Sequence, residues 1–249
     1  GYIINTENEV NVQRYYADGI TLQGANSTET ISSAFVTQVM NGMSRQNVGL
    51  ELGLDVKLSS TLSLQGLASI GEYIYTNNPE IYFGADAAGN FADGKAYTYM
   101  GRAYIDNYKQ SGTPQTAFSL GFRYNSPKYW WVGANWNYFD HSYLDPSAFI
   151  RTESFVTNPV TGVPYPELTE SELRRVLAQK KLPTAFFLNA NTGKSWLIGK
   201  YYLMVSASVN NILNNKNYIT GGFEQTRQTS YRAFVADFDK EYPNFAPKY

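Results

Sequence analysis

Residues Asn47 to Leu58 alternate apolar and polar side chains without a break, and this run constrains the fold more than any other part of the sequence. Every second residue is aliphatic, and the residues between are polar or glycine. A period of two puts all the aliphatic side chains on one face of a β-strand. The run exceeds the about 5 to 6 residues of an ordinary strand and suits the roughly 9 to 11 residues with which a tilted strand crosses a bilayer. The sequence therefore predicts a strand of membrane-spanning length.

The same alternation recurs along the chain and predicts an all-β, antiparallel fold. Near Gly66 the pattern becomes irregular, which favours a β-bulge in that strand. A weaker candidate strand at Glu9 to Ala17 precedes all the others. The further predicted strands are Thr61 to about Thr76, Thr116 to Asn125, Tyr129 to Phe139, about Thr184 to Thr192 and about Tyr201 to Asn211.

The links between these strands alternate in length. In a meandering antiparallel sheet, successive links lie at opposite ends, so this alternation puts every long link at one end. Short periplasmic turns and long extracellular loops are typical of outer-membrane barrels, whereas a soluble β-sandwich has no need of the asymmetry. We therefore predict a transmembrane β-barrel. The short links are 59–60, 126–128 and 193–200, and the long ones are 18–44, 77–115, 140–183 and the segment after 212.

Two long links contain structure of their own. Ala96 to Lys109 has strand-like alternation, but the order of long and short links requires it to stay outside the membrane. The predicted extracellular loop 140–183 contains a helix at 169–181, opened by the capping box Thr169-x-x-Glu172 and ended before Pro183.

Seven spanning strands result, whereas bacterial single-chain barrels generally have an even number. Residues 212–249 offer no further alternating segment, and two prolines in Asp237 to Tyr249 disfavour a paired strand there. Seven strands would also leave open edges in lipid. We therefore expect residues 1–249 to be the C-terminal portion of one larger barrel domain, without its final strand.

Composition excludes several classes of function. The formal net charge of −1 gives no electrostatic basis for binding nucleic acid. The absence of cysteine excludes disulfides, thiolate catalysis and zinc–sulfur sites. With 43% hydrophobic and only 16% charged residues, the chain is too apolar to be disordered and poor in charge for a soluble domain. Gly1 to Val10 shows no export signal, so an exported protein would need an upstream part.

Two contiguous runs resemble a known family. GKYYLMVSASVNNILNNKNYITGG, at Gly199 to Gly222, resembles the penultimate strand of TonB-dependent outer-membrane receptors. The run Gly112 to Asp145, which contains GTPQTAFSLGF and SPKYWWVGANWNYFDHSYLD, is similar to receptors from Bacteroidetes, including those that pair with a surface lipoprotein. The resemblance covers most of the chain from about Arg45 to Gly222.

The resemblance implies a barrel of about 22 strands around an N-terminal plug. It implies import of a scarce nutrient, such as a glycan, peptide or metal chelate, energised by the TonB–ExbB–ExbD complex acting through the plug. Outer-membrane lipid, and in some members a surface lipoprotein, would be the other partners. The chain contains no plug, TonB box or aromatic-ended final strand, so those parts receive no residues here.

The predicted contacts with a solute lie on the polar side of the strand Tyr129 to Phe139. There Tyr129, Trp131, Asn135 and Asn137 would face the lumen, while Trp130, Trp136 and Tyr138 on the other side favour an interfacial aromatic girdle over sugar stacking. The predicted lipid-facing residues are Val48, Leu50, Leu52, Leu54, Val56, Phe118, Leu120, Phe122, Val132, Leu203, Val205 and Val209.

We predict no catalytic, metal or cofactor site. The single histidine, His141, has Asp140 and Asp145 near it in sequence, but a strand leaving the membrane into a polar loop looks the same. Asp86 to Asp93 lacks the ligand spacing of an EF-hand. No G-x-S-x-G, P-loop or dinucleotide motif is present. A receptor without enzymatic activity is the leading hypothesis; the alternatives are a passive porin-like barrel and a secreted all-β carbohydrate-binding protein.

Overall fold

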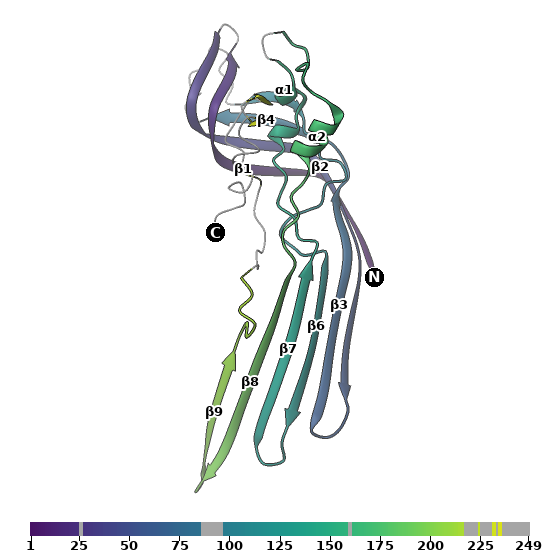
Figure 1. Ribbon diagram of the computed structural model, residues 1–249, viewed down its shortest axis with the longest axis vertical. Helices are drawn as coiled ribbons and strands as arrows, with labels where there is room; N and C mark the ends of the chain where they lie inside the picture. The colour runs from purple at the N-terminus through teal and green to yellow at the C-terminus, as the bar shows by residue number, and fades with distance from the viewer. Residues whose placement is uncertain are drawn as a thin grey trace.

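One nine-stranded antiparallel sheet runs through the whole molecule (Figure 1). The computed structural model describes residues 1–24, 27–85, 97–158, 161–216, 224, 231–232 and 234–235. The predicted all-β antiparallel fold is confirmed. The strands are β1 (Tyr2–Gly24), β2 (Ser27–Lys57), β3 (Leu62–Tyr75), β4 (Glu80–Ala85), β5 (Thr98–Arg102), β6 (Thr116–Asn125), β7 (Trp130–Asp140), β8 (Ala185–Ile198) and β9 (Tyr201–Val209).

We call the long lower part of the sheet the stem. It consists of residues 2–6 of β1, residues 45–57 of β2, and strands β3, β6, β7, β8 and β9, each paired with the next. Among the described residues, β9 pairs only with β8 and β1 only with β2, so the sheet is open. Every predicted strand is present, and the bounds of β6 are those predicted.

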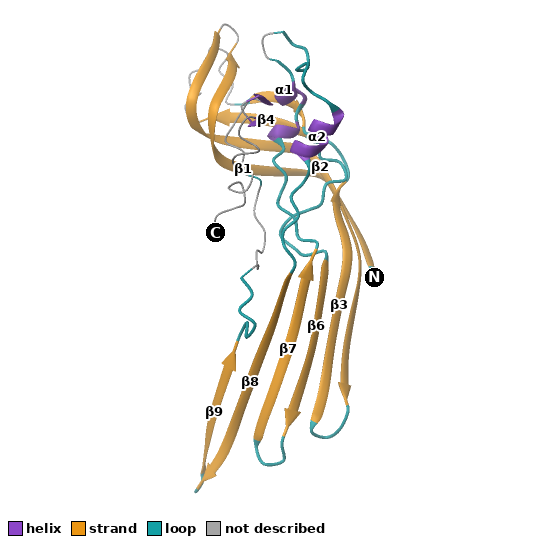
Figure 2. Cartoon of the chain, viewed as in Figure 1, coloured by secondary structure: helices purple, strands orange, loops and turns teal. Residues whose placement is uncertain are grey.

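The tight turns of the stem lie at one end and the long connections at the other (Figure 2). Residues 58–61, 126–129 and 199–200 make the turns at the lower end. The connections at 76–115 and 141–184 leave the upper end, and the second of them contains short helices. The predicted alternation of link lengths therefore corresponds to two different ends of the sheet.

The upper end is a separate packed region, which we call the head. It contains residues 9–24 of β1, residues 27–43 of β2, strands β4 and β5, and three short helices. Strand β4 pairs with residues 36–41 of β2, and β5 pairs with β4. The helices are η2 (Phe149–Arg151), α1 (Glu153–Val156) and α2 (Glu170–Leu177).

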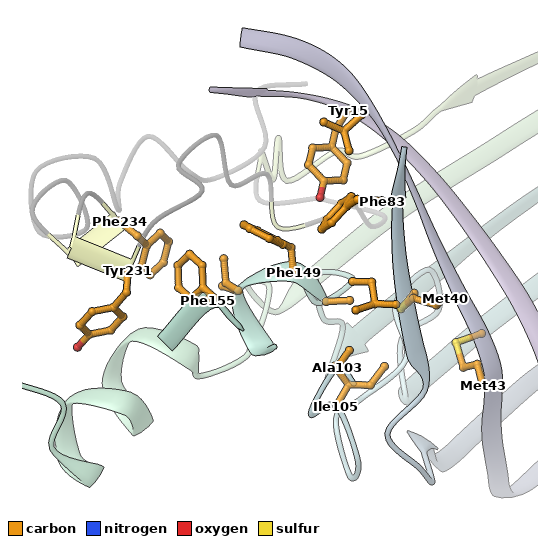
Figure 3. Close-up of a cluster of buried hydrophobic side chains, with 14 of the residues drawn as sticks. Tyr15, Met40, Met43, Phe83, Ala103, Ile105, Phe149, Phe155, Tyr231 and Phe234 are labelled. Carbon is orange, nitrogen blue, oxygen red and sulfur yellow. The ribbon is translucent and has the colours of Figure 1, made fainter. Parts of the chain in front are cut away.

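The buried hydrophobic cluster belongs to the head (Figure 3). Phe149 of the helical segment contacts Phe83 of β4, with ring centroids 4.9 Å apart. Within the helical segment, the ring centroids of Phe149 and Phe155 are 5.5 Å apart. Met40 and Met43 extend the cluster toward the stem. Since burial of such side chains supplies about 1.5–3 kcal/mol each, the long loops form one packed body.

A bulge in the hairpin of β1 and β2 joins the stem to the head. Gly42 has a φ of +71° and lies between the paired positions Met43 and Asn41. Such an extra residue reverses the inside and outside alternation of the strand. Asn77 holds the bulge, because its amide donates to the Gly42 carbonyl at 2.7 Å and its side-chain oxygen accepts from Ser44 N at 2.8 Å.

Four sequence predictions need correction. The predicted long link 18–44 is strand, because β1 and β2 continue into the head as one hairpin. No bulge occurs at Gly66, which pairs in unbroken register with Leu54 and Leu120. Strand β8 continues past Thr192 to Ile198, where it still pairs with β9. The helix predicted at 169–181 ends at Leu177, because residues 180–182 instead pair with the backbone of residues 142–144.

The described residues 97–109 of the predicted segment Ala96 to Lys109 add no strand to the stem. Strand β5 lies in the head and pairs there with β4, outside the stem.

Candidate functional site

The stem presents one continuous apolar face. The register places directly paired residues on the same side of the sheet, so Leu52 aligns with Ala68, and Ala68 with Phe118. These side chains are open to the surroundings: Leu52 is 66% exposed and Leu120 is 60% exposed. All the residues predicted to face lipid fall on this side, which we call the apolar face.

The apolar face of the described stem carries three charged residues, Glu72, Asp140 and Lys194. Glu72 and Asp140 are at the head end, where they pair with Lys109 and Lys181 respectively. Lys194 lies opposite Trp130 at the turn end of β7, while on its other side it lies opposite Val205 in the middle of β9. Between the head end and the level of Lys194, the apolar face is uncharged.

Aromatic residues form two bands on the apolar face. Near the head, the ring centroids of Phe118 and Tyr138 are 6.0 Å apart, and Trp136 is 5.9 Å from Tyr138. Near the turns, the centroids of Tyr124 and Trp130 are 5.2 Å apart. Six residues of strand separate Phe118 from Tyr124, or about 20 Å along the strand. The bands contain Trp130, Trp136 and Tyr138, the three residues predicted to form a girdle.

The opposite side of the stem, the polar face, holds three of the four predicted solute contacts. Trp131, Asn135 and Asn137 alternate along β7 and point to this side. Asn137 accepts a hydrogen bond from Ser119 Oγ at 2.8 Å. Tyr129 differs from the prediction, because it lies in the turn before β7 with a φ of +60° and is 71% exposed. The sheet therefore groups Trp131, Asn135 and Asn137 but not Tyr129.

Glycines on the polar face allow large rings to lie flat against the sheet. A Cβ at Gly193 would lie 2.1 Å from the Trp131 ring, and one at Gly71 would lie 2.7 Å from the Tyr73 ring. A Cβ at Gly49 would similarly collide with Tyr2, whose hydroxyl lies 2.5 Å from that of Tyr73. Glycine inside a strand permits such close approach. The rings of Trp131, Tyr73 and Tyr2 therefore lie directly over the backbone of these glycines.

The polar face is divided into a charged and a neutral part. Glu51, Asp55 and Lys57 of β2 are charged, and Asp55 accepts a hydrogen bond from Gln65 at 3.0 Å. Arg123 of β6, opposite Gly133 of β7, adds a positive charge to this face. Around β7 and β8 the side chains are mainly amides and hydroxyls, with Asn135 opposite Asn189 and Gly133 opposite Asn191. Amides donate and accept hydrogen bonds without charge.

A buried polar network in the head was not predicted from the sequence. The carboxylate of Asp145 accepts hydrogen bonds from Gln13 Nε2 and Tyr75 Oη, both at 2.8 Å. Gln13 accepts from Gln38 Nε2 at 3.2 Å, and Gln38 accepts from Tyr15 Oη at 3.0 Å. Burial raises the pKa of Asp145 above its ordinary value. Its partners are distant in sequence, and no local pattern marks them.

The predicted chemistry-bearing candidates do not form a reactive cluster. His141 Nδ1 lies 3.5 Å from Asp140 and 3.2 Å from Thr116 Oγ1, while Asp145 is directed into the head network. Within the described residues, no group of three or more histidine, aspartate or glutamate side chains is placed to hold a metal ion. Asp86 to Asp93 falls outside the described residues.

Comparisons with protein-family models, curated proteins and solved structures gave no match. In the described part of the chain, none of the helices has the length and hydropathy needed to cross a membrane.

Proposed function

We propose that the chain forms part of a β-barrel in the outer membrane of a Gram-negative bacterium. One observation carries this proposal: the stem presents an exposed apolar face that is uncharged from the head end down to the level of Trp130 and Lys194. In water such a face would be a strong aggregation surface. Against lipid, the uncharged middle meets hydrocarbon and the aromatic bands meet the headgroups.

We further propose that the barrel is that of a TonB-dependent import receptor of the Bacteroidetes type, to which this chain contributes a C-terminal part. The two runs that resemble this family fall on structurally defined elements. Gly112 to Asp145 covers β6, β7 and the start of the head loop, and the described part of the second run, 199–216, contains β9. The stem has tight turns at one end and the packed head at the other. This asymmetry supports an orientation with the turns in the periplasm and the head outside the cell.

In this proposal the polar face of the stem lines the transport path. Trp131, Asn135 and Asn137 would contact the solute or the plug that fills the barrel. Outer-membrane lipid covers the apolar face, and the TonB–ExbB–ExbD complex supplies energy through the plug. A surface lipoprotein would meet the receptor at the head. The proposed role is transport without covalent chemistry.

Uptake measurements in the source bacterium test the receptor proposal. Growth on a panel of glycans, peptides and metal chelates identifies the nutrient whose use is lost when the gene is deleted. A receptor requires that deletion of TonB abolish uptake of the same nutrient. Uptake that persists without TonB would contradict the receptor proposal and favour a passive porin. Recovery of the native protein as a soluble monomer without detergent would instead favour a secreted carbohydrate-binding protein.

A further inference from the structure

The hairpin of β8 and β9 carries positive charge and no negative charge. Residues 184–223 contain Lys194, Lys200 and Lys216 but no aspartate or glutamate. Lys194 and Lys200 are both exposed, and within the described residues neither forms a salt bridge. By contrast, the lysines at the head end of the apolar face are paired with carboxylates. The hairpin therefore presents two cations without a protein counter-ion.

Both ammonium groups lie over aromatic rings of the same hairpin. Lys194 Nζ is 5.5 Å from the centre of the Trp196 ring, and Lys200 Nζ is 5.7 Å from the centre of the Tyr201 ring. Lys194 belongs to the apolar face, where it lies opposite Val205. Trp196 is on the same side of β8 and closer to the turn. The Lys194 side chain therefore runs along the apolar face and directs its charge toward the turn, as lysines do at membrane surfaces.

The end of this hairpin projects beyond the turn that joins β6 to β7 (Figure 1). Trp130, the first residue of β7, pairs with Lys194, whereas β8 and β9 remain paired as far as Ile198 and Tyr201. Ile198 and Tyr201 are both exposed, so the apolar face continues to the end of the hairpin. The tilted and staggered strands of a barrel produce such a step between successive turns. We call residues 194–203 the hairpin tip.

We propose that the hairpin tip binds an anionic phospholipid, with the ammonium groups of Lys194 and Lys200 at its phosphate. The two lysines select an anion, and the exposed apolar side chains beside them are a surface for acyl chains of the same molecule. An amphiphile with an anionic headgroup supplies both. Tryptophan and tyrosine are typical of the headgroup level, and lysines at a membrane surface attract anionic lipid. This inference rests on the proposed membrane function and adds a lipid preference at the turn end.

Lipid-selective fluorescence quenching tests the proposal. A fluorophore on Leu203→Cys would lie beside the two lysines, since Leu203 pairs with Trp196 on the apolar face. A fluorophore on Leu64→Cys is the matched control, because Leu64 lies on the same face between Val56 and Phe122, away from any lysine of that face. In phosphatidylcholine vesicles, brominated phosphatidylglycerol should quench position 203 more strongly than the same fraction of brominated phosphatidylcholine. Both lipids should quench position 64 equally.

Substitution of the lysines shows whether they cause the preference. The expected enrichment of the anionic lipid is about fivefold for each lysine, which corresponds to about 1 kcal/mol per lysine at a membrane surface. Lys194→Gln and Lys200→Gln should each reduce the preference at position 203, and the double variant should abolish it. Lys57→Gln removes a lysine from the polar face at the same end and should leave the preference unchanged.

Three outcomes would contradict the proposal. Equal quenching of position 203 by the two brominated lipids would overturn the binding site without affecting the proposed membrane function. A preference for phosphatidylglycerol of the same size at position 64 would overturn it as well, because the attraction would then be general to the surface. If neither lipid quenches either position, the proposed membrane function is itself wrong, and the lipid site with it.

Discussion

The side chain of Asp145 links three parts of the molecule, since it accepts hydrogen bonds from Gln13 of β1 and Tyr75 of β3 while belonging to the long head loop. Burial raises its pKa, and the nearby charge of Glu224 acts in the same direction, although Tyr75 opposes them. The folded protein therefore binds the proton more tightly than the unfolded chain. Its contribution to stability is complete below the ordinary aspartate pKa and is lost as pH rises through the raised value.

Substitution of the Asp145 carboxyl group should make the stability of the head less dependent on pH. In Asp145→Asn the amide keeps one acceptor but does not ionise, so the decline in unfolding free energy as pH rises above the ordinary aspartate range should be smaller. Proteolytic susceptibility of the head, measured from acidic to neutral pH, reports this slope. The exposed Asp106→Asn is the matched control. A slope unchanged by Asp145→Asn would show that another group sets it.

The contact between Trp131 and Gly193 gives a steric prediction. A Cβ at Gly193 would lie 2.1 Å from the Trp131 ring, so Gly193→Ala should displace the ring and cost about 1–3 kcal/mol, the usual penalty of overpacking. Gly66→Ala is the control, because the nearest atom to its Cβ is 3.9 Å away. Thermal unfolding and tryptophan fluorescence, compared in both variants, would measure the effect on stability and on the Trp131 ring. Equal stability of the two variants would contradict the ring position.

At the scale of elements, helix α2 depends on the cap that the sequence indicated. Thr169 Oγ1 accepts from Glu172 N at 3.2 Å. Thr169→Ala should lower the stability of the helix by about 0.5–2 kcal/mol, whereas Thr169→Ser, which keeps the hydroxyl, should have little effect. Hydrogen exchange of residues 170–177 measures the difference. Equal protection in both variants would mean that packing, and not the cap, starts this helix.

Period-two alternation predicted the stem because one side of each stem strand is uniformly apolar. It failed in the head for a physical reason. The bulge at Gly42 places Met43 and Met40 on the same side although they are three residues apart, so a period of two is broken where the strand enters the head. For this reason the sequence predicts a link at residues 18–44, where the structure has a hairpin.

The polar contacts of the head were beyond sequence analysis. Arg151 and Glu224 are 73 residues apart, and Gln13 and Asp145 are 132 apart. Neither pair has a characteristic spacing, and each depends on how long loops pack. In the stem, by contrast, Trp131, Asn135 and Asn137 were assigned to one side correctly, since alternation alone decides that. Tyr129 was misplaced because the left-handed turn before β7 takes it out of the alternation.

At the scale of the whole molecule, the two faces of the stem should respond oppositely to charge. Leu52→Arg adds a charge to the apolar face and should cost about 2–4 kcal/mol of folding free energy in lipid. Ser69→Arg adds the same charge on the polar face, directly opposite Glu51, and should be tolerated. Folding titrations in phospholipid vesicles compare the two. Tolerance of Leu52→Arg together with failure of Ser69→Arg would mean that the faces are reversed.

The most direct test of the account is where the two faces lie relative to lipid. The sequence contains no cysteine, so Leu52→Cys and Ser69→Cys each introduce one labelling site for an environment-sensitive fluorophore. The protein is reconstituted in vesicles containing lipids with brominated acyl chains. We predict that the bromolipids quench the label at position 52 and not at position 69, and that aqueous iodide does not reach position 52. Iodide quenching at position 52 without bromolipid quenching would contradict a membrane-embedded stem.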